Sequence, residues 1–216
     1  TRGWWYDITA EDFDKDGDID LVVGNLGNNY KCQANEDETF DIFYNDFDGN
    51  NSGDIVLSYY NDGEQYPLRG RQCSSEQIPA IKLKFDDYDA FSIATLEDVY
   101  TEPALENSLH YFTKTFSSVY LENDGNSFNM SKLPVLAQLS SINKILKKDI
   151  DNDGFVDIIV SGNMFNSEVE TPRNDGSVGV LLKFHPNSGF KAIPARQSGL
   201  FLNGDIKDME FITLEN

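Results

Sequence analysis

Three segments of the chain place oxygen-bearing side chains on alternate positions of a nine-residue stretch that ends in aspartate. They read DFDKDGDID from Asp12, DFDGNNSGD from Asp46 and DIDNDGFVD from Asp149. Successive side chains of an extended turn point in opposite directions, so the odd positions converge on one centre. Hard cations such as Ca²⁺ take about six to eight oxygen ligands from a short, flexible loop. The spacing therefore predicts a calcium site in each segment.

We number these segments loops 1, 2 and 3 in chain order. Side-chain oxygens at positions one, three, five and nine, with the backbone carbonyl of position seven, form the predicted ligand set. The predicted ligands are Asp12, Asp14, Asp16, Asp18 and Asp20 in loop 1, Asp46, Asp48, Asn50, Ser52 and Asp54 in loop 2, and Asp149, Asp151, Asp153, Phe155 and Asp157 in loop 3. Loop 2 has Asn50 in place of Asp and lacks the glycine that follows position five in the other loops. We therefore expect the site in loop 2 to be the weakest.

An EF-hand begins in the same way, but it needs a bidentate Glu at position twelve and flanking helices. Position twelve is here Val23, Leu57 and Val160, which excludes the EF-hand and also dockerin-type loops. The residues that follow the loops read LVVG, IVLSYY and IIVSG, and such short β-branched runs predict strands. A single copy could be an Asx-rich turn without metal. Three copies in one register favour a repeat architecture with a metal in each unit.

Strands are predicted on both sides of every loop and in several further segments. The flanking strands are Tyr6–Ala10, Ile19–Gly24, Phe40–Asn45, Ile55–Tyr60, Ile142–Lys148 and Val156–Gly162. The further strands are Gln65–Arg69, Ser118–Glu122, Ser127–Met130, Gly179–Phe184 and Gly189–Ile193. The sequence Asn123-Asp124-Gly125-Asn126 predicts a tight hairpin turn between two of them. We expect a mainly β fold with repeat units at about 1–38, 39–73 and 116–200, and the start of another unit at 201–216.

The segment 74–115 interrupts this pattern and is interpreted as an α-helical insertion. Apolar residues recur in it at helical spacing, at Phe91, Ala94, Val99, Leu105, Leu109 and Phe112. This spacing predicts two or three short helices, with starts at Ser75 and at Thr101-Glu102-Pro103. The insertion is either a decoration between repeats or a ligand-facing cap, since long connections often carry binding residues. Near the C-terminus, Leu202–Leu214 predicts the first strand of a further unit.

The loops and the strands after them resemble FG-GAP/VCBS repeats, the calcium-loop units of integrin α-subunit-like β-propellers. In that family D-x-D-x-D-G-x-x-D joins the first two strands of a blade, and an apolar run ending in Gly follows. Asp12–Gly24 and Asp149–Gly162 match this pattern, and Asp46–Tyr60 matches it more loosely. SVYLENDGNSFNMSKLP and AQLSSINKILKKDIDNDG are similar to blade-end and blade-start segments of bacterial secreted or surface proteins. GRQCSSEQIP and FSIATLEDVY look like the helical insertion of one bacterial subfamily.

This resemblance implies a β-propeller, Ca²⁺ at the loops and an extracytoplasmic location (secreted, periplasmic or on the cell surface), and it implies no reaction. Closed propellers usually have about four blades or more, and integrin-type propellers have about seven. We therefore expect the chain to form part of a larger propeller. Its outer strands would then be open edges, which predicts edge-mediated self-association of this chain.

Composition limits the partners. The formal net charge is −20 and the pI is about 4.2, which argues against nucleic acid or anionic lipid as a partner. No apolar run approaches the length of a membrane span, so we expect no membrane insertion. Cys32 and Cys73 could form one bridge in an oxidising compartment or be unrelated thiols. No signal peptide is visible, and because the chain opens at Thr1 without Met we interpret it as a mature or truncated piece.

Two classes of function are open. The first is a binding or adhesion module for protein or glycan, with core packing expected for most aromatic residues. The aromatic residues considered as sugar-stacking candidates are Trp4, Trp5, Tyr6, Tyr59, Tyr60, Tyr66, Tyr88 and Tyr100. The second is a polysaccharide lyase or hydrolase, which would need a carboxylate pair in a cleft. The chain has two histidines and no G-x-S-x-G or H-E-x-x-H motif. The titratable candidates are His110, His185, Glu97, Glu102, Glu106 and Glu122, with no motif around them.

Overall fold

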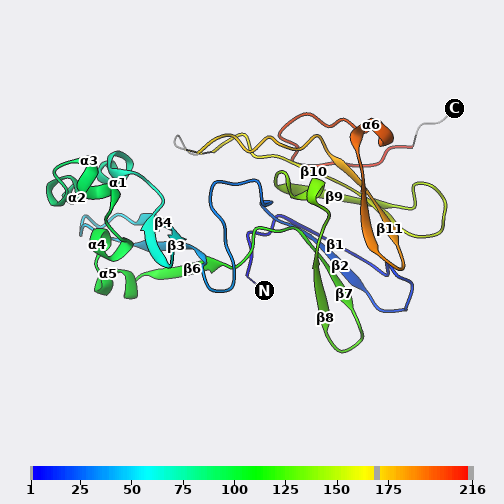
Figure 1. Ribbon diagram of the computed structural model, residues 1–216, viewed down its shortest axis with the longest axis horizontal. Coiled ribbons are helices and arrows are strands. Elements are labelled where there is room, and N and C mark those ends of the chain that lie inside the picture. Colours follow the sequence, from blue (N-terminus) through cyan, green and yellow to red (C-terminus); the bar gives the residue numbers. More distant parts are fainter. Residues whose placement is uncertain (1, 168–170, 214–216) are drawn as a thin grey trace. The chain divides into compact units, whose positions relative to one another are not determined.

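The computed structural model describes residues 2–167 and 171–213 of the chain. These residues divide into two compact units: unit 1 contains residues 2–3 and 32–115, and unit 2 contains residues 4–31 and 116–213. In the described ranges the fold is mainly β, with twelve strands in three antiparallel four-stranded sheets and no closed barrel (Figure 1). The predicted mainly β class is confirmed, and the β-propeller stays a prediction.

Unit 2 contains two of the sheets. The first sheet has the strand order β1-β2-β7-β8, with β1 at Asp7–Glu11, β2 at Asp20–Gly24, β7 at Val119–Asn123 and β8 at Phe128–Lys132. The second has the order β12-β11-β10-β9, with β9 at Ile142–Lys148, β10 at Asp157–Gly162, β11 at Val180–His185 and β12 at Gly189–Ile193. A 3₁₀ helix η1 at Val135–Gln138 and a short helix α6 at Ala195–Ser198 complete the unit.

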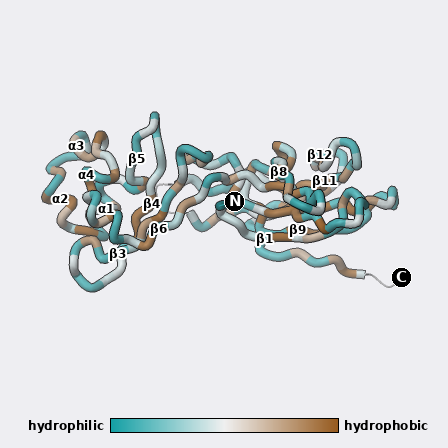
Figure 2. The backbone as a smooth tube through the Cα atoms, turned by 90° about the horizontal axis from the view of Figure 1, so that it is seen from below, coloured by the Kyte–Doolittle hydropathy of each residue, from teal (hydrophilic) through white to brown (hydrophobic). Residues whose placement is uncertain are grey.

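One hydrophobic core joins the two sheets of unit 2. Inward-facing residues of β2, β9, β10 and β11 pack together with the fully buried ring of Phe13, which is position two of loop 1. The core consists of Phe13, Val22, Tyr120, Leu133, Ala137, Ile142, Ile145, Ile158, Val160, Val180, Leu182 and Phe184. Figure 2 shows short hydrophobic stretches in brown among the strands and hydrophilic stretches in teal in many connecting loops. Phe13 is a residue of loop 1 and also a member of the hydrophobic core, so loop 1 is anchored in this core.

Unit 1 contains the third sheet and a group of short helices. The sheet order is β5-β4-β3-β6, with β3 at Phe40–Asn45, β4 at Asp54–Asn61, β5 at Glu64–Pro67 and β6 at Leu109–Thr113. The helices are α1 at Arg71–Gln77, α2 at Ala80–Lys84, α3 at Tyr88–Ser92, α4 at Leu96–Tyr100 and α5 at Glu102–Glu106. Their apolar residues pack on one face of the sheet, against Phe43 of β3 and Val56 of β4.

Unit 1 is inserted in the chain between two neighbouring strands of one sheet. β2 ends at Gly24, and its next partner is β7, with Val22 opposite Tyr120. Residues 116–132 therefore complete the sheet that β1 and β2 begin, and loop 2 lies inside the insertion. The pairing divides the chain differently from the predicted units 1–38, 39–73 and 116–200.

Most predicted strands agree with the structure within one or two residues, and the turn at Asn123–Asn126 joins β7 to β8 as predicted. Three expectations about helices are wrong. Leu109 and Phe112 lie on β6 rather than on a helix, because the stretch LHYFT pairs with β3. Ser75 lies inside α1, which begins at Arg71. The described residues 71–106 form five short helices where two or three were expected; the predicted start at Thr101–Pro103 coincides with α5.

The strand predicted at Leu202–Leu214 is also wrong for the described residues 202–213, and Leu214 lies outside them. Isolated backbone hydrogen bonds hold this segment instead. The Leu202 N–H donates to the Val178 carbonyl at 2.7 Å, and the Ile206 N–H donates to the Gly162 carbonyl at 3.0 Å. No helix of the described residues is long and apolar enough to cross a membrane.

Candidate metal centres

Each loop closes a hairpin between two paired strands. Loop 1 joins β1 to β2, loop 2 joins β3 to β4, and loop 3 joins β9 to β10. In all three, position nine pairs across the ladder with the residue just before the loop: Glu11 with Asp20, Asn45 with Asp54, and Lys148 with Asp157. The aspartate at position nine is therefore the first residue of the second strand.

The backbone turns in the same way in each loop. Position six has a positive φ, at +101° for Gly17, +64° for Asn51 and +93° for Gly154. Asn tolerates this left-handed conformation better than most side chains do, so Asn51 replaces the glycine that loop 2 lacks. Position four is also left-handed in every loop, and Lys15 and Asn152 adopt φ values of +66° and +59° there.

Side-chain oxygens fix these turns through repeated hydrogen bonds. The N–H of position six donates to the carboxylate of position one, at 3.2 Å in loop 1, 2.8 Å in loop 2 and 3.0 Å in loop 3. The N–H of position seven donates to the side chain of position five, at 2.8, 2.7 and 2.8 Å. These bonds hold the side chains of positions one and five in one orientation. The loop conformation is therefore fixed by hydrogen bonds within the protein itself.

The predicted carboxylate ligands come together in each loop, at positions one, three and five in loops 1 and 3 and at positions one, three and nine in loop 2. Ligand atoms within 4.8 Å of one another belong to Asp12, Asp14 and Asp16 in loop 1, Asp46, Asp48 and Asp54 in loop 2, and Asp149, Asp151 and Asp153 in loop 3. Several clusters could thus hold a metal ion, as predicted, and carboxylate oxygens suit a hard divalent cation. Position nine belongs to the cluster in loop 2 alone.

One oxygen of position one is left without a donor in two loops. Asp12 Oδ1 and Asp149 Oδ1 are buried, and neither accepts a hydrogen bond from any described residue. The other oxygen of each carboxylate is held by the N–H of position six. A buried carboxylate oxygen without a partner costs free energy, so this position fits a cation as its missing partner.

Position nine has a second role in loops 1 and 3. Asp20 is fully buried, and it accepts hydrogen bonds from the Phe13 N–H at 3.1 Å, the Tyr120 hydroxyl at 2.8 Å and the Asn123 N–H at 2.8 Å. Asp157 is likewise buried and accepts from the N–H groups of Ile150 and Phe184. Each carboxylate thus ties its loop to the third strand of the same sheet.

The electrostatics of the loops are those of crowded carboxylates. Desolvation raises the pKa of the Asp14 carboxyl, and the neighbouring carboxylates of its own loop raise it further, although an N–H bond from Asp16 lowers it. Burial also raises the pKa of Asp157. In loop 3 the Lys183 ammonium, on β11, forms an ion pair with Asp151 and lowers the pKa of that carboxyl. Lys183 was not predicted from the sequence, because nothing in its strand, VLLKFH, indicates that the lysine forms an ion pair with a carboxylate of loop 3.

The residues considered for catalysis are distributed over five elements, and of them only Glu102 and Glu106 share one. His110 on β6 meets the buried Asp41 of β3, with 2.5 Å between Nε2 and Oδ1, and its ring stacks on Phe43 with centroids 4.2 Å apart. His185 is the last residue of β11. The four glutamates lie on α4, α5 and β7: Glu97, Glu102, Glu106 and Glu122. The Asp41–His110 pair was not predicted, since its residues are far apart in sequence.

The aromatic candidates divide between core and surface. Tyr100 is buried among the helices of unit 1, and Tyr59 and Tyr66 pair across β4 and β5 with ring centroids 6.4 Å apart. Trp4 and Tyr6 are both exposed, so the core packing expected for them is wrong.

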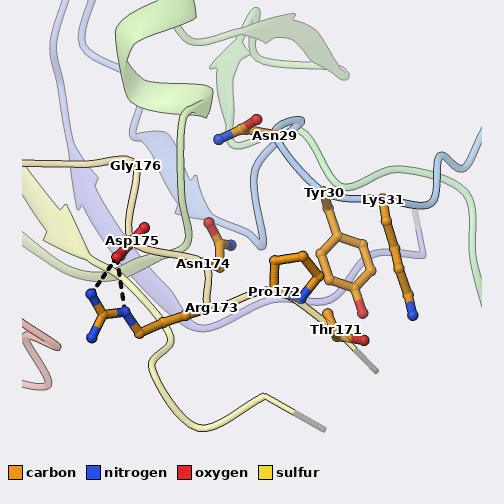
Figure 3. Close-up of a pocket in the computed structure, with 9 residues that line it drawn as sticks. All are labelled: Asn29, Tyr30, Lys31, Thr171, Pro172, Arg173, Asn174, Asp175 and Gly176. Carbon is orange, nitrogen blue, oxygen red and sulfur yellow. Dashed lines mark hydrogen bonds and ion pairs between the residues drawn. The ribbon is translucent and has the colours of Figure 1, made fainter. Parts of the chain in front are cut away.

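Unit 2 also contains a cleft of about 370 Å³ that the sequence did not indicate (Figure 3). It is lined by residues 29–31, which follow β2, and residues 171–176, which follow β10. Arg173 donates to Asp175 from Nε at 2.8 Å, and the Tyr30 ring stands opposite Pro172 and Thr171 in the close-up. Loops 1 and 3 precede β2 and β10, whereas the cleft residues follow these strands. The cleft and the two carboxylate clusters therefore lie at opposite ends of β2 and β10.

The comparisons with known proteins add no relative: no protein-family model, no curated protein and no solved structure matches this chain.

Proposed function

We propose that loops 1, 2 and 3 bind Ca²⁺ and that the protein is an extracytoplasmic, calcium-stabilised part of a β-propeller of the FG-GAP/VCBS type. In this proposal it acts as a binding or adhesion module for a protein or a glycan. The observation that carries the calcium assignment is the buried, unpaired oxygen of Asp12 and of Asp149, each beside two further carboxylates. A divalent cation supplies the missing partner and removes the repulsion among the three charges.

The cation has a structural role in this proposal. Each loop joins the first two strands of its hairpin, and the position-nine carboxylate of loops 1 and 3 reaches the third strand through hydrogen bonds. Bound Ca²⁺ would therefore stiffen the turn and fix the strands that leave it. Because the ion binds the folded loop, it stabilises the protein by mass action.

The propeller assignment rests on repetition. Three four-stranded antiparallel sheets each contain one strand–loop–strand hairpin of the same geometry, and two of the sheets share a core. Loops of this kind in extracellular modules bind Ca²⁺ with dissociation constants of about 10⁻⁴ to 10⁻³ M, which suits a calcium-rich compartment. This supports the extracytoplasmic location.

The alternative, the propeller part of a polysaccharide lyase or hydrolase, has less support. A glycosidase needs two carboxyl groups facing each other across a cleft. Among the described residues, the close groups of three or more carboxylates are those of the three loops, which the metal proposal already uses. The Asp41–His110 pair alone does not define a reaction.

Calorimetric titration of the chelator-treated protein with Ca²⁺ and separately with Mg²⁺ tests the metal proposal. We expect binding of Ca²⁺ in the range given above and weaker binding of Mg²⁺, which demands strict octahedral geometry and gives up its water reluctantly. Absence of calcium binding at millimolar concentration would falsify the assignment. A glycan array with and without Ca²⁺, run beside an assay for released reducing ends, tests the second half. Calcium-dependent retention without release supports a binding module, and release supports the enzyme.

A further inference from the structure

The cleft that follows β2 and β10 has two walls, and backbone hydrogen bonds hold both of them in place. The N–H groups of Asn28 and Asn29 donate to the Gln138 carbonyl at 2.8 and 3.3 Å, which fixes the wall after β2. Two backbone bonds between Met164 and Asn174, 2.7 and 3.0 Å long, fix the wall after β10. The cleft is therefore preformed, as sites for small ligands usually are.

A close contact at Gly176 brings the second wall against the first. A Cβ atom at this position would lie 2.6 Å from the Leu139 carbonyl oxygen and 3.0 Å from Asn29 Nδ2, so a larger residue does not fit. Asn29 Nδ2 donates to the same Leu139 carbonyl at 3.2 Å. The spacing of the walls is thus set by glycine and by this hydrogen bond.

Several polar groups of the lining keep hydrogen-bonding capacity that the described residues do not use. The Asn174 side chain is 5% exposed, and its amide has two N–H donors but one acceptor, the Leu26 carbonyl at 3.4 Å. Asn29 Oδ1 receives no hydrogen bond from the described residues. Arg173 Nε and Nη2 both point to Asp175 Oδ2, at 2.8 and 2.6 Å, which leaves Nη1 of the one and Oδ1 of the other available. The cleft therefore offers donors and acceptors together.

Arg173 is held in one orientation although it is exposed. Its guanidinium pairs with Asp175 and lies over the Phe165 ring, 4.3 Å from the ring centroid. Exposed ion pairs add little to stability. A side chain that is already fixed loses less conformational entropy when a ligand binds. The Arg173–Asp175 pair thus presents a donor beside an acceptor in a preorganised geometry.

Tyr30 gives the other end of the cleft an aromatic wall. Figure 3 shows its ring beside Pro172 and Thr171, with the Arg173–Asp175 pair at the opposite end. The ring packs edge-on against the buried Phe116, with centroids 5.9 Å apart. The face of an aromatic ring is electron-rich and attracts C–H groups, such as those on the apolar side of a sugar ring.

These features narrow the class of ligand. The Asp175 carboxylate and the net charge of −20 disfavour an anion, and the cations Lys31 and Arg173 disfavour a cation. An apolar molecule would bury the donors and acceptors of the lining without partners. A hydroxyl group both donates and accepts, so a polyhydroxyl ligand can use both kinds of group at once.

We propose that this cleft binds a neutral glycan, with a sugar ring on Tyr30 and hydroxyl groups on the Arg173–Asp175 pair and on the amides of Asn29 and Asn174. The volume of about 370 Å³ lies near the lower end of the range for ligand sites, about 300–1,000 Å³, and suits a short stretch of sugar chain. The inference rests on the proposed role as a binding module, and it selects the glycan over the protein as the ligand.

Affinity electrophoresis of the whole chain in calcium buffer tests the proposal. The gels contain hydroxyethylcellulose, galactomannan, amylose or dextran as neutral probes, and hyaluronate as the anionic comparison. We expect at least one neutral probe to retard the protein, with a dissociation constant of about 0.01–1 mM, and hyaluronate to have no effect.

Two substitutions locate the site. Tyr30→Leu keeps apolar packing on Phe116 but removes the ring face, and Arg173→Met removes the fixed donor; each should weaken retention about tenfold. The matched controls are Tyr88→Leu on α3 and Arg196→Met on α6, which change exposed residues outside the cleft. Both controls should bind as the wild type does.

Three results would overturn the proposal: no retardation by any of the neutral probes, stronger retardation by hyaluronate than by all of them, or unchanged retention in both cleft variants while circular dichroism shows them folded. If Tyr30→Leu fails to fold, Arg173→Met decides, because its side chain is 56% exposed. Calcium titration of Arg173→Met should match the wild type, since the loops lie at the other end of β2 and β10.

The failures of the two proposals are distinguishable. Loss of glycan retention with intact calcium binding counts against the cleft alone, and absent calcium binding with intact retention counts against the calcium sites alone. Release of reducing ends from a retained polysaccharide, abolished by Arg173→Met, supports the cleft and contradicts the role as a binding module.

Discussion

The substitution Asp12→Asn separates the charge of the position-one carboxylate from its hydrogen bond. The amide keeps an oxygen that can accept from the Gly17 N–H, which lies 3.2 Å from Asp12 Oδ2. It removes the negative charge from a cluster whose ligand atoms lie within 4.8 Å of one another. We therefore expect opposite effects in the presence and absence of calcium.

The magnitudes follow from mass action and from Coulomb's law. A site at a calcium concentration 100 times its dissociation constant contributes about 2.7 kcal/mol, or roughly 8 °C of melting temperature for a protein of this size. Asp12→Asn should remove most of this gain for loop 1. In chelator, two charges 4.8 Å apart in a water-like dielectric repel by roughly 0.9 kcal/mol. The chelator-treated variant should therefore melt at or slightly above the temperature of the chelator-treated wild type.

Differential scanning calorimetry of both proteins, with calcium and with chelator, measures the four melting temperatures. Glu122→Gln is the matched control, because Glu122 is an exposed carboxylate on β7 of the same unit and lies outside the loops. This substitution should change neither the calcium-dependent increase in melting temperature nor the melting temperature in chelator appreciably. The reasoning is refuted if Asp12→Asn lowers the melting temperature equally with calcium and with chelator. The carboxylate would then act as a hydrogen-bond acceptor and not as a ligand.

Three further changes test other parts of the structure. Lys183→Met removes the ammonium that pairs with Asp151 of loop 3. Titration calorimetry should then find that calcium binds loop 3 about two- to fivefold more tightly. Unchanged affinity would contradict competition between the lysine and the ion. Gly162→Ala would force a Cβ into the Ser141 carbonyl oxygen and should cost about 3 kcal/mol in urea unfolding, whereas Gly204→Ala meets its nearest atom at 3.5 Å and should cost far less. Arg71→Met removes a buried guanidinium that donates to three backbone carbonyls at 2.7 to 3.4 Å. It should destabilise unit 1 by about 2–4 kcal/mol, and a smaller loss would mean that the carbonyls find other donors.

The local parts of the structure were predictable, because they depend on short-range patterns. Alternating oxygens and the β-branched runs after them identify the hairpins around Asp12 and Asp149, and the left-handed positions at Gly17 and Gly154 follow from the glycines. The hairpin turn at Gly125 is local in the same sense.

The non-local parts were not predictable, because a strand's own sequence does not name its partner. β2 pairs with β7 although residues 32–115 of unit 1 separate the two strands in the sequence. Nothing in the sequence near Val22 identifies Tyr120 as its partner. The stretch around Leu109 fits a helical period and a strand period equally, and pairing with β3 decides between them. The pairing of Lys183 with loop 3 depends in turn on the register of β11 beside β10.

Loop 2 shows how such non-local contacts alter a loop of nearly constant sequence. In loop 1 the position-nine carboxylate accepts hydrogen bonds from Tyr120 and the backbone of β7 and lies outside the group of three carboxylates. In loop 2 the equivalent Asp54 lies close enough to Asp46 and Asp48 to join their cluster. Loop 2 therefore still presents three carboxylates despite the amide at Asn50, and the expectation that its site is the weakest stays a prediction. What separates the loops is whether the position-nine carboxylate accepts hydrogen bonds from the neighbouring strand, as in loops 1 and 3, or belongs to the carboxylate cluster, as in loop 2.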